Sequence, residues 1–249
     1  MVDGDGLGVT APAVVLLVHA VDSTATAAST MRSLRIQSVN GRAAESLRGI
    51  VAQVFKPDEE VWKRFLQATR GQPAWGRLIK AASMFETPGD ALDVGAGGGR
   101  DTAHLLKLGW RVTAVDASPA ASEILRMLEP QANLRVVTSA AQDFEPASYD
   151  LVNAQFSLPF VPPAFFATTV RRLNDAVRPA GVMAVTFFGP RDEWNVAGSE
   201  LTFTTRQEVE RWFQGWETIE LTEIEEDGTT ATGGAKHWDV IHVIARKRA

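Results

Sequence analysis

The sequence predicts an α/β protein with a mostly parallel sheet, and three observations lead to this prediction. From Ala91 to the C-terminus, short apolar and β-branched segments alternate with segments of helical periodicity. A glycine-rich turn follows the first of these strands, and an acid ends the second. The last two strands are joined by a loop alone. This favours an antiparallel hairpin, because parallel neighbours need a crossover that is usually helical.

The chain divides into an N-terminal extension, a helical segment and the sheet. Residues 1–41 are rich in Ala, Ser, Thr and Gly without sustained periodicity, and we expect a poorly ordered extension there. Met31 is an alternative start of translation within it. From residue 42 to 88, apolar residues recur at helical spacing in three stretches. We expect residues 42–249 to form one domain, in which these helices precede a core formed by residues 89–249.

Strands and helices of the core are expected in strict order. The expected strands cover residues 91–94, 111–115, 134–138, 149–154, 182–188, 218–226 and 238–245. The expected helices cover residues 100–108, 119–128, 163–177 and 205–214. Thr205 and Glu208 have the spacing of a capping box at the last helix. Between the last two strands, residues 227–235 (DGTTATGGA) are expected to form a flexible turn.

The turn at residues 95–99 contains four glycines and carries most of the functional signal. Without Cβ atoms its backbone can lie directly against a ligand, and the free N–H groups of the following helix face the same point. Asp116 ends the second strand, near the spacing of roughly 20 residues at which an acid binds a ribose in nucleotide-binding folds. The third glycine of a dinucleotide fingerprint is replaced by Arg100, which disfavours NAD and FAD. The pattern predicts a nucleoside-binding half-site.

On the motif DVGAGGGRD at residues 93–101, the chain resembles the class I S-adenosylmethionine-dependent methyltransferases. The resemblance extends from about Phe55 to the C-terminus. It is greatest to the small-molecule branch that includes the tellurite-resistance methyltransferases. It implies a Rossmann-like, mostly parallel seven-stranded sheet with helices on both faces and an antiparallel last strand. It further implies that residues 42–88 form a lid, with S-adenosylmethionine as cofactor and S-adenosylhomocysteine as product.

The resemblance also assigns cofactor contacts. Asp93 is expected near the ammonium group of the cofactor and Asp116 on its ribose. Arg100 is expected either to pair with the methionine carboxylate or to form a surface salt bridge. The family's acid that reads the adenine amino group is replaced by Ala140, so we expect neighbouring backbone and Gln142 to take over. The expected cofactor-binding residues are Asp93, Gly95, Ala96, Gly97, Arg100, Asp116, Ala117, Ala141, Gln142 and Asn153.

Two segments are candidates for binding the acceptor. After the strand at 149–154, Phe156 and Phe160 are expected either to line the acceptor pocket or to belong to the core. In the loop after the strand at 182–188, Arg191 is expected to bind an anionic acceptor and Trp194 to cover it. The alternative for this loop is a solvated segment with the tryptophan packed beneath it.

Three further side chains have weaker roles in this reading. His237, just before the last strand, is a weak candidate for a general base. Trp62 and Trp75, in the helical segment, either pack or contact the substrate.

Composition restricts the partners. The formal net charge is −5, so a basic face for nucleic acid is not expected. There are no cysteines, which removes disulfides and thiolate metal sites, and we expect no metal. The longest early apolar run, residues 11–21, is too short to span a bilayer, so we expect a cytoplasmic protein without a membrane partner.

These observations lead to one main functional hypothesis. It is S-adenosylmethionine-dependent methyl transfer to a heteroatom of a small-molecule acceptor by in-line displacement. The alternative is a non-catalytic S-adenosylmethionine-binding or partner-binding module, which the alanine at position 140 motivates. A nicotinamide oxidoreductase is a third hypothesis, which Arg100 disfavours.

Overall fold

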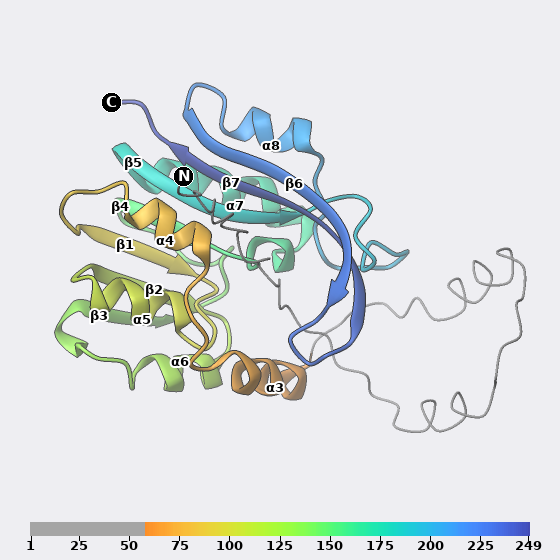
Figure 1. Cartoon of the computed structure of the whole chain (residues 1–249), viewed down its shortest axis with the longest axis horizontal. Helices are drawn as coiled ribbons and strands as arrows, with labels where there is room; N and C mark the ends of the chain where they lie inside the picture. Colours follow the sequence, from red (N-terminus) through yellow and green to blue (C-terminus); the bar gives the residue numbers. More distant parts are fainter. Residues whose placement is uncertain (1–57) are drawn as a thin grey trace, which may run out of the picture.

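The computed structural model describes residues 58–249, which form a seven-stranded sheet with helices packed on both faces (Figure 1). The expected extension at residues 1–41 and the first helical stretch lie outside the described residues. The strands are β1 (Asp90–Val94), β2 (Arg111–Asp116), β3 (Leu134–Thr138), β4 (Tyr149–Ala154), β5 (Val177–Phe188), β6 (Glu217–Thr229) and β7 (Ala235–Arg246). The helices are α3 (Glu59–Thr69), α4 (Gly76–Ala82), α5 (Arg100–Lys107), α6 (Pro119–Leu125), α7 (Pro163–Ala176) and α8 (Arg206–Trp212), with the short 3-10 helices η1 (Gln131–Asn133) and η2 (Leu158–Phe160).

The strand order is β3-β2-β1-β4-β5-β7-β6. β1 pairs in parallel with β2 on one side and with β4 on the other, so the order of the sheet reverses at β1. In open α/β sheets, ligands bind at the carboxyl ends of the strands at such a reversal. β7 runs antiparallel to both β5 and β6. The predicted mostly parallel sheet with an antiparallel last strand is therefore confirmed.

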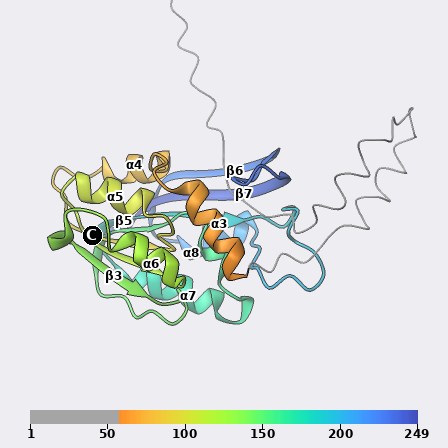
Figure 2. The ribbon, with the colours of Figure 1, turned by 90° about the horizontal axis from the view of Figure 1, so that it is seen from below.

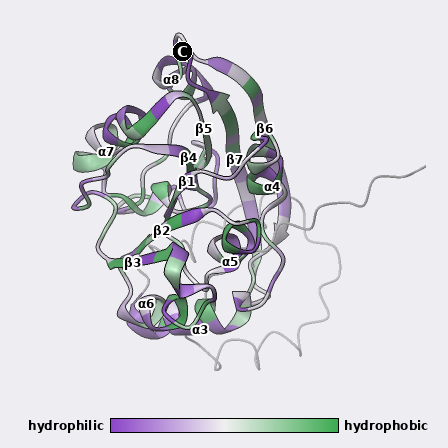
Figure 3. Cartoon of the chain, turned by 90° about the vertical axis from the view of Figure 1, so that its left-hand side faces the viewer, coloured by the Kyte–Doolittle hydropathy of each residue, from purple (hydrophilic) through white to green (hydrophobic). Residues whose placement is uncertain are grey.

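The two faces of the sheet bury separate sets of side chains, because successive residues of a strand point to opposite sides. On one face, Leu92 and Val152 pack with α7 and α8. On the other face, Ala91 and Leu151 pack with α4 and α5. In Figure 3, α4 and α5 lie on one side of the strands, and α7 lies on the other. α6 packs on the face of α5, because its Leu125 clusters with Ala114 of β2, which points to the same side as Val112. This two-sided core holds the carboxyl ends of the strands in fixed positions.

Local capping sets where the helices begin. Asp58 caps α3 by accepting a hydrogen bond from the N–H of Val61 at 2.8 Å. The predicted capping box is confirmed at α8, where Thr205 and Glu208 bond reciprocally. In Figures 1 and 2, α3 lies between α6 and the far end of the β6–β7 hairpin. None of the helices within residues 58–249 is long and apolar enough to cross a membrane.

The β6–β7 hairpin is longer than the sequence predicted. Asp227, Gly228 and Thr229 were expected in a flexible turn, but they continue β6 and pair with the start of β7. The turn itself is confined to residues 230–234 and closes with a hydrogen bond from the N–H of Thr230 to the carbonyl of Gly234. β5 pairs with β7 only up to Val240, so the outer part of the hairpin extends beyond β5. It packs instead against the loop that follows β5.

Candidate functional site

A cavity of about 630 Å³ lies at the carboxyl ends of β1, β2 and β4, where the strand order reverses. Its volume falls within the range of about 300–1,000 Å³ that is usual for small-molecule sites. All the residues expected to bind a cofactor line it, namely Asp93, Gly95, Ala96, Gly97, Arg100, Asp116, Ala117, Ala141, Gln142 and Asn153. Residues as far apart in the sequence as Asp93 and Asn153 therefore lie on one wall, because parallel strands bring their carboxyl ends to the same edge of the sheet.

The glycine turn forms the narrow side of the cavity. Gly95 and Gly97 have φ angles of 68° and 52°, in the left-handed region that favours glycine. A Cβ on Gly95 would lie 2.2 Å from the Cβ of Ser157, so no side chain fits there. The N–H of Gly97 donates to Asp116 Oδ2 at 2.8 Å, and the N–H of Ser118 donates to Oδ1 at 2.8 Å. Asp116 thus ties the turn to the start of α6 while its carboxylate lies on the cavity wall.

Two buried carboxylates lie side by side at the base of the cavity. Asp93 accepts hydrogen bonds from Thr102 Oγ1 at 2.6 Å and from Asn153 Nδ2 at 2.9 Å. Asn153 Nδ2 also donates to Asp101 Oδ2 at 2.9 Å. Within residues 58–249, neither carboxylate has a lysine or arginine at ion-pair distance. Burial, followed by the charge of Asp101, raises the pKa of Asp93 to about 7.

The hydrogen-bonded chain continues from this base into the sheet. Gln155 Nε2 donates to Asn153 Oδ1 at 3.2 Å, and Thr186 Oγ1 donates to Gln155 Oε1 at 2.9 Å. Since the Thr186 proton is used there, the bond of 2.9 Å to His242 requires Nδ1–H of the imidazole as donor. Burial lowers the pKa of His242 to about 3, which keeps the ring neutral. Both ends of the Gln155 amide are therefore fixed, and this side chain lines the cavity.

Aromatic rings form the opposite wall. Phe156 and Phe160 line the cavity as expected, and Trp62, Phe65 and Trp75 join them. The rings are in mutual contact. Trp62 lies 5.1 Å from Phe160, and Trp75 lies 4.8 Å from Phe156, between ring centroids. The sequence offered one signal for Trp62, because helical spacing places it on the same face of α3 as Phe65.

Comparisons with known proteins agree with this geometry. Residues 92–185 match the family model of a methyltransferase domain. The trans-aconitate 2-methyltransferase of Enterobacter sp. (strain 638) is 35% identical over 122 residues, which are 47% of this chain and 46% of that protein. The chain spans about half the length of the curated relatives it matches.

Solved structures share the fold. TehB from Haemophilus influenzae superposes with a TM-score of 0.60 at 19% identity, over 70% of this chain and 63% of that one. A second structure is the 1,6-didemethyltoxoflavin-N1-methyltransferase of Burkholderia thailandensis, with bound 1,6-didemethyltoxoflavin and S-adenosylhomocysteine. Its TM-score is 0.54 at 20% identity, over 87% of this chain and 93% of that one. Residues 92–185 thus match a methyltransferase domain, and the fold is the one that these solved structures share.

In this methyltransferase fold, Arg100 contacts the chain itself. Its Nε donates to the carbonyl of Pro73 at 2.7 Å, and its guanidinium lies 4.3 Å above the ring of Trp75. No surface salt bridge to this residue occurs within the described part of the chain. Arg100 thus holds the segment before α4 against the start of α5. It also lines the cavity, and a guanidinium has five N–H donors, so these contacts leave N–H groups for a cofactor carboxylate.

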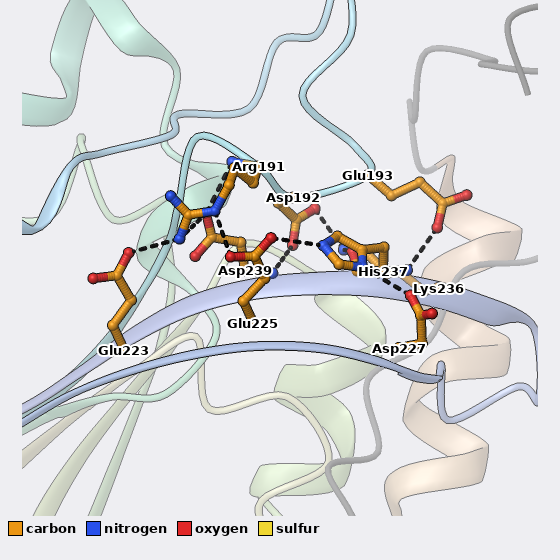
Figure 4. Close-up of polar contacts among 9 residues, drawn as sticks. All are labelled: Arg191, Asp192, Glu193, Glu223, Glu225, Asp227, Lys236, His237 and Asp239. Atoms are coloured by element: carbon orange, nitrogen blue, oxygen red, sulfur yellow. Dashed lines mark hydrogen bonds and ion pairs between the residues drawn. The ribbon is translucent and has the colours of Figure 1, made fainter. Parts of the chain in front are cut away.

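Arg191 and Trp194, in the first part of the loop after β5, do not line the cavity, contrary to the expectation for them, whereas Glu200 and Leu201 at the end of that loop do. Arg191 Nε lies 2.6 Å from Glu225 Oε2, and its Nη2 lies 3.0 Å from Glu223 Oε1, both on β6 (Figure 4). Trp194 is buried, and the ammonium of Lys236 lies 4.3 Å from its ring. The alternative of a loop packed on its tryptophan is the observed arrangement. The reason is the β6–β7 hairpin, which extends past β5 and packs against the loop.

His237 also lies away from the cavity, on the outer part of β7. Its Nδ1 lies 2.7 Å from Asp227 Oδ1, and its Nε2 lies 3.4 Å from Glu225 Oε1 (Figure 4). The hydrogen bond that His237 donates to the Asp227 carboxylate is the largest influence and raises the pKa of His237. A general base must reach the proton that it removes, and this ring does not line the cavity. Residues 58–249 contain no group of three or more metal-ligating side chains placed to hold an ion.

Proposed function

We propose that the chain binds S-adenosylmethionine in this cavity and catalyses transfer of its methyl group to a heteroatom of a small molecule. The observation that carries the proposal is the glycine turn held by Asp116 beside carboxylates of the cavity wall that form no ion pair with lysine or arginine within residues 58–249. This wall fits S-adenosylmethionine, which carries an ammonium, a sulfonium and one carboxylate and is therefore net positive. The cofactor, when bound, supplies an electrophilic methyl group on a charged sulfur.

The residues present fit the cofactor in a second respect. Ser157 lies directly across the turn from Gly95, and its hydroxyl is buried without a hydrogen-bond partner among the described residues. Buried polar atoms without partners are rare in native proteins, so a ligand hydrogen bond at this point would remove a cost of about 1–3 kcal/mol. Ser157 and the glycine turn line the same cavity.

In this proposal each wall has a task. Asp116 accepts hydrogen bonds from the ribose hydroxyls, and the backbone at Ala117, Ala141 and Gln142 holds the adenine. The charge of Asp93 attracts the ammonium group. Phe156 and Phe160 exclude water from the reacting atoms. Positioning alone supplies much of the rate enhancement of such a displacement, so no catalytic triad is required.

The comparisons support methyl transfer more than a binding role. The curated relative is named for methyl transfer to trans-aconitate, and the structural neighbour is named for methyl transfer to a ring nitrogen. Neither name favours the alternative of a non-catalytic module. Because the chain spans only part of its curated relatives, we treat the acceptor as a separate question.

Isothermal titration with S-adenosylhomocysteine tests the proposal. Asp116→Ala should weaken binding by about 10- to 100-fold, since hydrogen bonds to a charged group contribute about 1.5–3 kcal/mol each. Asp143→Ala is the matched control, because this exposed acid lies in the neighbouring loop but not on the cavity wall, and it should bind normally. Absence of binding by the wild-type chain, or equal binding by Asp116→Ala, would overturn the proposal.

A further inference from the structure

The charge distribution of the cavity restricts the acceptor. Asp93, Asp101 and Asp116 line it, whereas Arg100 is the one basic side chain on its wall within residues 58–249. The guanidinium of Arg100 is held by a hydrogen bond to the carbonyl of Pro73 and lies over the ring of Trp75. Because the acids on the wall outnumber this cation, an anionic acceptor would lose its hydration against a wall of like charge, and burial of such a charge costs several kcal/mol.

The arrangement of the aromatic rings away from the glycine turn indicates a planar acceptor. The C-terminal end of α3 lies against the glycine turn, since a Cβ built on Gly98 would lie 3.2 Å from Thr69 Oγ1. Trp62 lies two turns earlier on α3 and meets Phe160, away from that turn. The ring contacts then run without a break from Phe160 to Phe188, Phe156 and Trp75. Aromatic walls of this kind stack flat rings and attract cations over their faces.

The acceptor atom follows from the negative charge of the wall and from the absence of histidine among its described residues. A phenol becomes a strong nucleophile only as phenolate, and neighbouring carboxylates disfavour that anion. His237 lies outside the cavity, and His242 is bonded to Thr186 behind the wall. An aromatic amine or a ring nitrogen already carries a lone pair in its neutral form. Such an acceptor needs no base within the described residues.

We infer that the acceptor is a planar aromatic molecule, neutral or cationic, that is methylated on nitrogen, and that carboxylates are excluded. This inference rests on the proposed function. In the reaction, the nitrogen lone pair forms the new bond to carbon, and the electron pair of the broken carbon–sulfur bond stays on sulfur. For an amine, the proton of the methylated product leaves to water.

Three probes with the same ring system test the inference on the full chain. 1-Naphthylamine, 1-naphthol and 1-naphthoate share the naphthalene ring and differ in their amino, hydroxyl or carboxylate group, and trans-aconitate serves as an acyclic polyanion. We expect the amine to bind the S-adenosylhomocysteine-loaded protein at least about 10-fold more tightly than 1-naphthoate, as judged by titration calorimetry. With S-adenosylmethionine, the amine should also yield more methylated product than the phenol.

Two variants test whether the aromatic probes bind at the rings that line the cavity. Trp62→Ala should weaken binding of 1-naphthylamine while leaving the affinity for S-adenosylhomocysteine within about twofold, because Trp62 contacts Phe160 rather than the turn. Phe165→Ala, an exposed ring on α7 outside the cavity, should change neither affinity.

The outcomes separate the two proposals. Failure to bind S-adenosylhomocysteine would contradict the proposed function whatever the probes do. Normal cofactor binding with equal or tighter binding of 1-naphthoate or trans-aconitate would overturn the present inference alone. No measurable binding of any aromatic probe, or faster methylation of 1-naphthol, would overturn it as well.

Discussion

Two clusters of buried charge in this molecule are built on different principles. On the β6–β7 hairpin, Lys236 Nζ lies 2.5 Å from Asp192 Oδ1 and 3.8 Å from the ring of Trp238. At the cavity base, Asp93 and Asp101 receive only hydroxyl, amide and backbone hydrogen bonds. The hairpin cluster compensates its charge internally, whereas the cavity base leaves negative charge for a ligand to compensate. The comparison separates a structural cluster from a binding cluster, although both are buried.

The pKa values of the two clusters show the same contrast. Burial lowers the pKa of Lys236 to about 8, and the charge of Asp192 limits that decrease. Burial raises the pKa of Asp192, and Lys236 opposes that increase. At the cavity base, burial and the neighbouring carboxylate act together on Asp93, and both raise its pKa. A net-positive ligand would lower the pKa of Asp93 and so oppose both effects.

The largest effect is expected from breaking the hairpin pair. Lys236→Met leaves Asp192 buried without a cation, which should lower the free energy of unfolding by about 3–5 kcal/mol. Urea denaturation monitored by circular dichroism measures this change. The double variant Lys236→Met/Asp192→Leu should recover most of the loss, because it removes both charges. A single variant as stable as the wild type would show that the pair contributes no structural compensation.

A smaller, pH-dependent effect is expected at the cavity base. The pKa of Asp93 is raised from 3.8 to about 7, so the stability linked to its protonated form is present below pH 3.8 and is lost as the pH rises through 7. Binding of a net-positive ligand favours the ionised carboxylate. Between pH 4 and 7, binding of S-adenosylmethionine should therefore release protons, and its affinity should fall by up to about 10-fold per pH unit of acidification.

Calorimetry at pH 6 in two buffers of different ionisation enthalpy measures the released protons. Asp93→Asn should reduce the release, although Asp101 faces the same space and contributes to it. S-Adenosylhomocysteine, which lacks the sulfonium charge, should show a weaker pH dependence than S-adenosylmethionine. Proton uptake on binding, or no linkage at all, would contradict the assignment of the cavity base as a cation-binding site.

The smallest effect is expected at His237. Because its pKa is raised in the folded state, its contribution to the free energy of unfolding is present below pH 6.5 and is lost as the pH rises through the raised pKa. The side chain is 37% exposed, so solvent screening limits the contribution to about 0.2–1 kcal/mol. His237→Gln should lower stability at pH 6 within that range and leave methyl transfer unchanged. A loss of turnover at constant substrate affinity would restore His237 as a candidate base.

The sequence was most informative where structure is local. β3 and β4 have the predicted bounds, and Asp93 and Asp116 lie at the carboxyl ends of neighbouring strands, because strand composition and chain order determine both. Arg191 and Trp194, in the loop after β5, were expected at the acceptor but do not line the cavity. The position of this part of the loop depends on how far β6 and β7 extend past Phe188, and that register arises from pairing between distant residues. Likewise, the partner of Arg100 lies 27 residues earlier, in a segment whose fold is not encoded by the glycine motif.

A crystal structure of the full chain with S-adenosylhomocysteine tests the central claim most directly. We predict the ribose hydroxyls on Asp116, the adenine beside Ala141 and Gln142, and the sulfur facing the aromatic wall at Phe156 and Phe160. Electron density for the ligand at another site, or a cavity that stays empty at saturating ligand, would contradict the account.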